Sequence, residues 1–178
     1  MKTDYAAILI KPDAIRDALD EAILRDIREI VSIQPIFRKL WRISTNIVPL
    51  IYPEWINRPE FPSMVFNITQ GHSLLVIVKG SETIHSELIR VKGKMNKGGL
   101  RLKYRRHSIE EWQMLGYSGQ KLLHKVAENR LHTTDTREET TLLCSLSMNL
   151  HEITSLAKEH PVFAGEIRRH TAVQVWTG

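Results

Sequence analysis

Two short segments that lie far apart in the sequence carry side chains suited to handling phosphate. In the first, Lys11 ends an apolar run at residues 6–10. In the second, His132 comes just before Asp135, which together with Glu138 forms a helix-start pattern. Histidine has an unperturbed pKa of about 6.5 and keeps a free lone pair near neutral pH, and a helix N-terminus favours a nearby anion. The two segments therefore indicate a site where a lysine binds phosphate and a histidine acts as a nucleophile.

Other kinds of chemistry leave no comparable pattern in this chain. The seven other histidines show neither the paired spacing nor the cysteine partners of a metal site. The single cysteine, Cys144, lies among leucines and is expected to be a buried core thiol. No glycine-rich phosphate loop is present, so any bound phosphate must be neutralised by separate cations. Taken alone, however, a histidine in the position of His132 is more often a helix cap or a surface residue.

The pattern of apolar residues predicts the strands that would hold these side chains. Residues 5–10 read as a short buried strand, which places Lys11 at a strand end. Prolines break the segment 49–62 into short helices and turns, so this segment is a candidate lid or rim. Further strands are expected at 35–44, at 73–78 and in a short segment that runs up to Leu131.

Helices are expected between and after these strands. Apolar residues recur at helical spacing over 15–30. Ser81 is a plausible N-cap for the next helix. Ser108 and Glu111 form a capping-box pattern that should open another helix, and a last one is expected to begin at Asp135.

This alternation of strands and helices predicts an α+β fold. The arrangement that fits is a ferredoxin-like α/β sandwich with a four-stranded antiparallel sheet and helices on one face. With 178 residues, of which 42% are hydrophobic, we expect a single domain over 1–178. No apolar run approaches the roughly 18 residues that span a bilayer, and the N-terminus lacks the apolar stretch of a signal peptide. We therefore expect a cytoplasmic protein without a membrane partner.

The net charge of +5 is concentrated in one stretch of the chain. Residues 92–106 contain seven lysines and arginines and no acidic residue. Such a run is compatible with a solvated loop, with a nucleotide-phosphate site or with binding of a nucleic-acid backbone. The sequence leaves these three alternatives open.

The order of the charged residues resembles that of the nucleoside diphosphate kinase family. The resemblance covers roughly residues 5–104 and 126–150. Lys11, in Lys11-Pro12-Asp13, is similar to the family's lysine that contacts the nucleotide near the transferred phosphate. Tyr52 is similar to the tyrosine that closes the site near the histidine. The other matches are two arginines that hold the terminal phosphates and an asparagine that binds the ribose, namely Arg90 with Gly93, Arg101 in Gly98-Gly99-Leu100-Arg101, and Asn129.

Membership of this family implies a phosphotransferase that moves the terminal phosphate of a nucleoside triphosphate to a nucleoside diphosphate. His132 would carry the phosphate as phosphohistidine, with Lys11 and Tyr52 as further catalytic residues. Mg²⁺ would arrive on the nucleotide, without metal ligands from the protein. The family also implies a homo-oligomer, a dimer or larger. The implied nucleotide-binding residues are Lys11, Arg90, Arg101 and Asn129.

Two departures from the family pattern affect nucleotide binding. Glu60 stands where the family stacks an aromatic ring on the base, so Phe61 or Trp55 would have to supply the ring. Met95 replaces a threonine that contacts phosphate in the family. Phe61 and Met95 are therefore included among the candidate nucleotide-binding residues. The departures leave an alternative function open: a catalytically impaired nucleotide- or phosphate-binding module, or a specialised enzyme acting on another phosphorylated substrate.

Three further departures affect the nucleophile and the architecture. Leu143 replaces the family's glutamate that orients the histidine. Glu139, one turn earlier on the same face, could reach His132 in its place, but it is interpreted as a solvated helix residue. Asp17-Ala18 replaces an arginine-glycine pair. An insert at about 105–125, expected to be helical, could cover the site, form a dimer contact or present a basic face.

Overall fold

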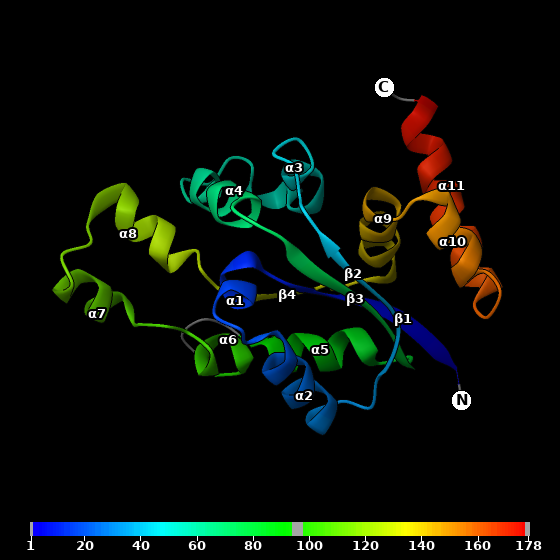
Figure 1. The fold of residues 1–178 in the computed structure, drawn as a ribbon, viewed down its shortest axis with the longest axis horizontal. Helices are drawn as coiled ribbons and strands as arrows, with labels where there is room; N and C mark the ends of the chain where they lie inside the picture. Colours follow the sequence, from blue (N-terminus) through cyan, green and yellow to red (C-terminus); the bar gives the residue numbers. More distant parts are fainter. Residues whose placement is uncertain (1, 94–97, 177–178) are drawn as a thin grey trace.

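The computed structural model describes residues 2–93 and 98–176, and the side chains up to residue 171. A four-stranded antiparallel sheet runs through the middle of the molecule in the order β2-β3-β1-β4 (Figure 1). This result confirms the predicted α+β fold with its four-stranded antiparallel sheet. The strands are β1 (Thr3–Ile10), β2 (Gln34–Trp41), β3 (Ser73–Ser81) and β4 (Leu131–Thr133).

The central strand β1 is buried on both of its faces. Ala6, Ile8 and Ile10 point into one hydrophobic core, and Ala7 and Leu9 point into a second core on the other side of the sheet. Successive side chains of a strand alternate between its faces, so a continuous apolar run requires cover on both sides.

Helices accordingly cover both faces, and the expectation that they lie on one face was wrong. Figure 1 shows the two helical layers with the sheet between them. On one side lie α1 (Pro12–Arg16), α2 (Asp20–Ile30), α5 (Ile84–Lys92) and α6 (Leu100–Lys103). On the other side lie α3 (Val48–Ile51), the 3₁₀ turn η1 (Pro53–Trp55), α4 (Phe61–Thr69), α9 (Arg137–Ser147), α10 (Leu150–Leu156) and α11 (Pro161–Trp176).

The helical pattern over 15–30 forms two helices rather than one. The break between α1 and α2 contains Ala18, whose φ of +54° lies in the left-handed region. A left-handed residue cannot continue a right-handed helix, and it is strained unless it is glycine. The break lies at Asp17-Ala18, where the resemblance implies an arginine-glycine pair, so alanine stands at a position suited to glycine.

Two of the predicted helix starts are shifted along the chain. The N-cap of α5 is Thr83 and not Ser81, although the Ser81 hydroxyl contacts that of Thr83 at 2.8 Å. The last predicted helix, α9, has Thr136 as its N-cap instead of Asp135. The capping box at Ser108, in contrast, is present as predicted.

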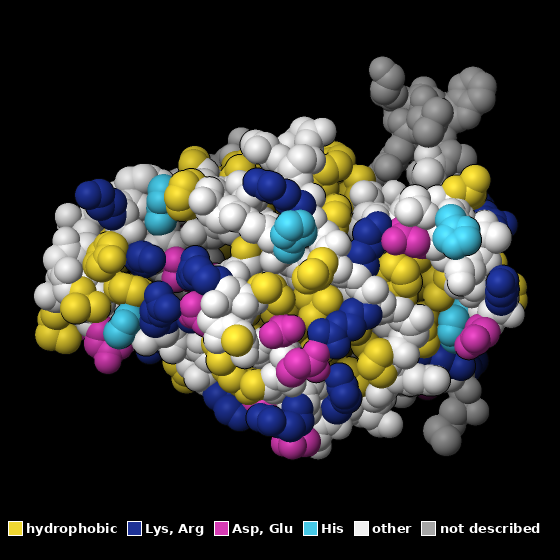
Figure 2. Space-filling view, viewed as in Figure 1, with side chains coloured by type: hydrophobic (Ala, Val, Ile, Leu, Met, Phe, Trp, Pro, Cys, Tyr) yellow, Lys and Arg dark blue, Asp and Glu magenta, His cyan; other side chains and the backbone are white. Residues whose placement is uncertain are grey.

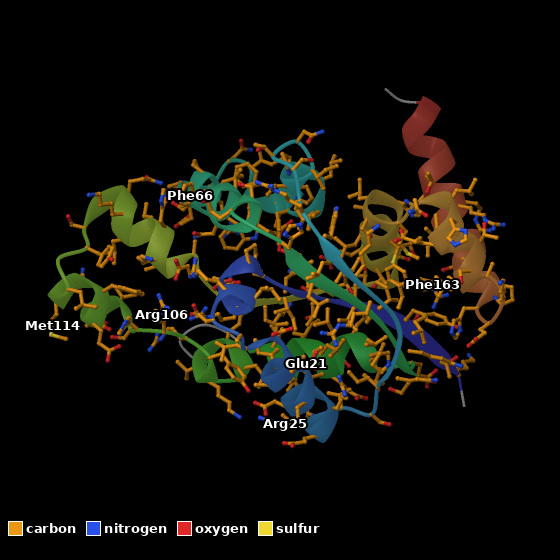
Figure 3. The ribbon with its side chains drawn as sticks, in the orientation of Figure 1. Glu21, Arg25, Phe66, Arg106, Met114 and Phe163 are labelled. Atoms are coloured by element: carbon orange, nitrogen blue, oxygen red, sulfur yellow. The ribbon has the colours of Figure 1, made fainter. Side chains whose placement is uncertain are left out.

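The insert forms two helices, α7 (Ile109–Met114) and α8 (Gly119–Val126), at one end of the molecule. Gln120 of α8 donates a hydrogen bond to the buried Ser63 hydroxyl of α4 at 2.8 Å. The Asn67 amide donates to the carbonyl of His124 at 2.6 Å, and Phe66, labelled in Figure 3, stacks on the His124 ring. These contacts attach α8 to α4. None of the described helices combines the length and the apolar character needed to cross a bilayer.

Candidate active site

A cavity of about 620 Å³ opens between α4, α8 and the ends of β1 and β4. Its lining mixes cations, acids and apolar side chains, and it includes five of the candidate residues. The lining residues are Lys11, Tyr52, Glu54, Trp55, Arg58, Glu60, Met64, Lys92, Arg101, Leu123, Val126, Ala127, Asn129, His132 and Asp135.

The pairing of β1 with β4 brings the two phosphate-handling segments together. His132 pairs with Leu9 in the antiparallel ladder, and the Lys11 amide donates to the Arg130 carbonyl at 2.8 Å. Lys11 and His132 are both buried, with 3% and 8% of their surfaces exposed. The predicted juxtaposition of the two segments is therefore present in the fold.

Arg130 fastens the strand that carries the histidine. Its backbone has a φ of +62°, and its buried guanidinium donates to the Asp13 carbonyl at 2.6 Å and lies 2.7 Å from the Asp17 carboxylate. Burial favours the neutral form of Asp17, but the hydrogen bond and charge of Arg130 outweigh it and lower the pKa of that carboxyl. This network ties β4 to the turn that follows Lys11.

The ring of His132 is held by Glu139. Nε2 of His132 lies 2.8 Å from one carboxylate oxygen of Glu139, and the other oxygen accepts a hydrogen bond from the Asp135 amide at 2.6 Å. The interpretation of Glu139 as a solvated helix residue was therefore wrong. The Thr136 hydroxyl accepts from the Glu139 amide, so a Thr-x-x-Glu helix-start pattern, shifted one residue from the predicted one, identifies Glu139 in the sequence.

The electrostatics favour a neutral His132. Burial is the largest cause that lowers its pKa, and the nearby ammonium groups of Lys92 and Lys11 lower it further. The hydrogen bond to Glu139 acts in the opposite direction without reversing the shift. An ionised carboxylate only accepts hydrogen bonds, so the neutral ring donates from Nε2 and leaves the lone pair on Nδ1.

Lys11 shares the cavity with other cations. Burial, followed by the charge of Arg101, lowers the pKa of Lys11 to about 7, and Asp13 only partly offsets the shift. Its ammonium lies 5.5 Å from the centre of the Tyr52 ring. A cation held in this way becomes better stabilised when an anion enters the cavity.

Tyr52 packs edge-on against His132, with 5.0 Å between the ring centres. Burial raises the pKa of its hydroxyl, which therefore stays protonated. The hydroxyl oxygen of Tyr52 and the amide oxygen of Asn129 are buried without a hydrogen-bond partner in the described part of the chain. Buried polar atoms are seldom left unpaired, so both are available to a ligand.

Lys92, which the sequence analysis did not single out, joins Lys11 and Arg101 in the lining. Its buried ammonium donates to the Thr133 carbonyl at 3.2 Å and to the Asp135 carboxylate at 2.8 Å. Arg101 donates to the Leu131 carbonyl at 2.9 Å. Arg90, two residues before Lys92 on α5, is exposed and is not part of the lining.

Of the two remaining candidates, the structure places one and does not describe the other. Phe61 packs against the hydrophobic core and is not among the lining residues. Met95 falls outside the residues that the structure describes. Trp55 and Glu60 do line the cavity, and the guanidinium of Arg58 lies 4.6 Å from the centre of the Trp55 ring.

The basic run 92–106 does not form one free cationic face. Lys92 pairs with Asp135, Lys103 with Asp26 and Arg106 with Asp17, while Arg101 lines the cavity. Lys94 and Lys97 lie outside the described residues. In the face drawn in Figure 2, basic side chains are interspersed with acidic and hydrophobic ones. Binding of nucleic acid through this run stays a prediction.

Comparison with known proteins adds one sequence match. No protein-family model matches the chain. A nucleoside diphosphate kinase of Methanobrevibacter smithii is 30% identical over 89 residues, which are 50% of this chain and 58% of that protein. The matched part of the chain thus spans a little over half the length of this curated relative.

Solved structures show a wider similarity. The nucleoside diphosphate kinase of Aquifex aeolicus superposes with a TM-score of 0.60 at 18% identity, covering 85% of this chain and 99% of that one. The Halobacterium salinarum enzyme in complex with CDP gives 0.64 at 18% identity, covering 85% and 91%. The Borrelia burgdorferi enzyme with vanadate and ADP gives 0.64 at 14% identity, covering 84% and 89%. These solved structures show that the chain has the fold of nucleoside diphosphate kinases, and the partial sequence match supports a divergent likeness to such an enzyme.

Proposed function

We propose that the protein is a phosphotransferase that moves the terminal phosphate of a nucleoside triphosphate to a nucleoside diphosphate through phosphohistidine on His132. One observation carries the proposal. The histidine whose Nε2 is held by Glu139 lines the same cavity as Lys11, Lys92 and Arg101. A neutral, oriented nucleophile is thereby combined with cations that can hold phosphate.

The chemical step begins with the free lone pair on Nδ1 of His132. Nδ1 attacks the terminal phosphorus, the bond from that phosphorus to the bridging oxygen breaks, and the nucleoside diphosphate leaves with the bonding electrons. The ring then carries positive charge, which the Glu139 carboxylate stabilises through the Nε2 proton. A second nucleoside diphosphate attacks the phosphohistidine and takes the phosphate, which restores the neutral ring.

The cations stabilise the charge that spreads over the phosphoryl oxygens during this step. Lys11 and Lys92, which are buried, and Arg101, which is partly buried, provide ammonium and guanidinium donors to the cavity. Charge-assisted hydrogen bonds of this kind are roughly twice as strong as neutral ones. The unpaired hydroxyl of Tyr52 and amide of Asn129 would position the nucleotide.

Mg²⁺ fits the proposal as an ion that arrives with the nucleotide. No group of three potential metal-ligating side chains occurs among the described residues. The Glu54 and Asp135 carboxylates in the lining are the oxygen donors that suit it. When bound, Mg²⁺ supplies charge neutralisation to the phosphates.

The test is incubation with γ-labelled ATP and Mg²⁺, comparing the wild type with His132→Ala. The expected result is an acid-labile phosphoenzyme on the wild type alone, which unlabelled nucleoside diphosphate discharges. Turnover that survives in His132→Ala would refute the mechanism. Nucleotide binding without labelling would favour the impaired binding module instead.

A further inference from the structure

The outer end of the cavity has an apolar wall that the insert provides. The outer end comprises the partly or fully exposed lining residues Trp55, Arg58, Glu60, Leu123, Val126 and Ala127, and the apolar wall consists of the last three. The last three belong to α8 and its C-terminal cap, which the contacts with α4 hold in place. A flat ring that entered beyond the phosphates would pack against these aliphatic side chains.

This end differs from a simple stacking slot. Phe61 is packed into the core, and Arg58 already occupies one face of the Trp55 ring at 4.6 Å. Little aromatic surface is left for a base, so selection there depends on the polar groups at the base edge. Two such groups, Arg58 and Glu60, lie two residues apart on the rim.

These two side chains offer opposite hydrogen-bonding capacities. A guanidinium stacked on a ring directs its N–H donors outward in its own plane, and a carboxylate presents two acceptors. Neither Arg58 nor Glu60 forms a side-chain hydrogen bond or ion pair with another residue in the described parts of the chain. The lining thus presents a donor and an acceptor from Arg58 and Glu60, both without a protein partner for these bonds in the described parts of the chain.

We propose that this end selects guanine nucleotides, an inference that rests on the function proposed above. The Watson–Crick edge of guanine has the O6 acceptor beside two adjacent donors, N1–H and N2–H₂. Arg58 would donate to O6, and the Glu60 carboxylate would accept from N1–H and N2–H₂. Adenine turns an unprotonated N1 toward such a carboxylate, and uracil offers one donor between two carbonyls, so both are disfavoured.

Calorimetric titration of the full chain with GDP, IDP, ADP, UDP and inorganic tripolyphosphate tests the inference. GDP should bind about tenfold more tightly than ADP or UDP, the effect of one net hydrogen bond to a charged group. IDP, which lacks the N2 amino group, should fall between them. The affinity for tripolyphosphate measures the contribution of the phosphate-binding residues alone.

Two variants separate recognition of the base edge from packing of the base against the apolar wall. Glu60→Gln should abolish the preference for GDP and leave the affinity for tripolyphosphate unchanged. Leu123→Ala should weaken all four nucleotides similarly and spare tripolyphosphate. Glu82→Gln, an equivalent change at an exposed position outside the cavity, is the matched control and should resemble the wild type.

The outcomes distinguish this inference from the proposed function. Equal affinities for the four nucleotides, or a GDP preference that survives in Glu60→Gln, would overturn guanine selection while the phosphate site stands. If tripolyphosphate and all the nucleotides fail to bind, the proposed function itself fails.

Discussion

Glu139 lies 2.8 Å from Nε2 of His132 and four residues before Leu143, the position at which the resemblance to nucleoside diphosphate kinases implies an orienting glutamate. The two positions are one helical turn apart on α9. Leu143, fully buried, fills the core instead. In this chain the carboxylate beside His132 comes from Glu139, and the amide of Asp135 donates to its second oxygen.

Glu139→Gln should slow formation of the phosphoenzyme by about 10- to 100-fold, the usual effect of losing a partner that orients a functional histidine. The amide keeps the size of the side chain but cannot stabilise the charged ring. Nucleotide affinity should change little, because Glu139 does not line the cavity that contains the cations. Rapid-quench labelling checks the rate, with the exposed neighbour Glu138→Gln as control. Equal rates for both variants would contradict the role of Glu139.

Leu143→Glu, which restores the family's residue, should destabilise the protein by about 3 kcal/mol or more. The change puts a carboxyl group in place of a buried leucine in a hydrophobic core, where burial disfavours a charged group. Urea denaturation measures the loss. A variant as stable as the wild type would show that α9 can turn this position toward His132.

The sequence was sufficient to predict the sheet because apolar runs and turn signals depend only on neighbouring residues in the chain. The run before Lys11 and the short strand expected up to Leu131 indicated β1 and β4, and the pairing of these strands brought the two segments together. The helix α9 was predicted, but α10, α11 and the layer that they form with α9 on this face of the sheet were not. Burial on both faces of β1 required such cover, but it did not indicate which part of the chain would provide it.

The identity of the second phosphate-site cation was not predictable in the same way. Arg90 and Lys92 are both basic and lie on one short helix, and a difference of two residues turns a side chain to another face. Only the packing of α5 against β4 places Lys92 inside. Glu138 and Glu139 presented the same ambiguity at the start of α9.

Lys92→Met should weaken binding of inorganic tripolyphosphate by at least about tenfold, and Arg90→Met by less than about twofold. The first change removes a buried charge-assisted donor and leaves Asp135 unpaired in the cavity, where it repels phosphate. The second change alters an exposed residue outside the lining. Calorimetry compares the two. A larger loss of tripolyphosphate affinity in Arg90→Met than in Lys92→Met would show that Arg90 belongs to the phosphate site.

Ala18→Gly should raise the free energy of unfolding by about 0.5 to 1 kcal/mol. Ala18 has a φ of +54°, which costs an alanine more than a glycine, and this gain exceeds the greater entropy of glycine in the unfolded chain. Ala157→Gly, at a helix cap with a φ of −64°, is the matched control and should lose stability. Denaturant titration tests both. Destabilisation by Ala18→Gly would show that the methyl group contributes packing that outweighs the strain.

Binding of tripolyphosphate should be coupled to proton uptake by Lys11. Burial and Arg101 lower the pKa of Lys11 to about 7 in the free protein, so much of it is neutral at pH 8. A bound polyphosphate favours the charged form and raises this pKa, so a proton enters on binding and the affinity falls as pH rises above about 7. Titrations at pH 8 in buffers of different ionisation enthalpy measure the uptake, and Lys11→Met should abolish it. Uptake that persists in Lys11→Met would assign the proton to another group.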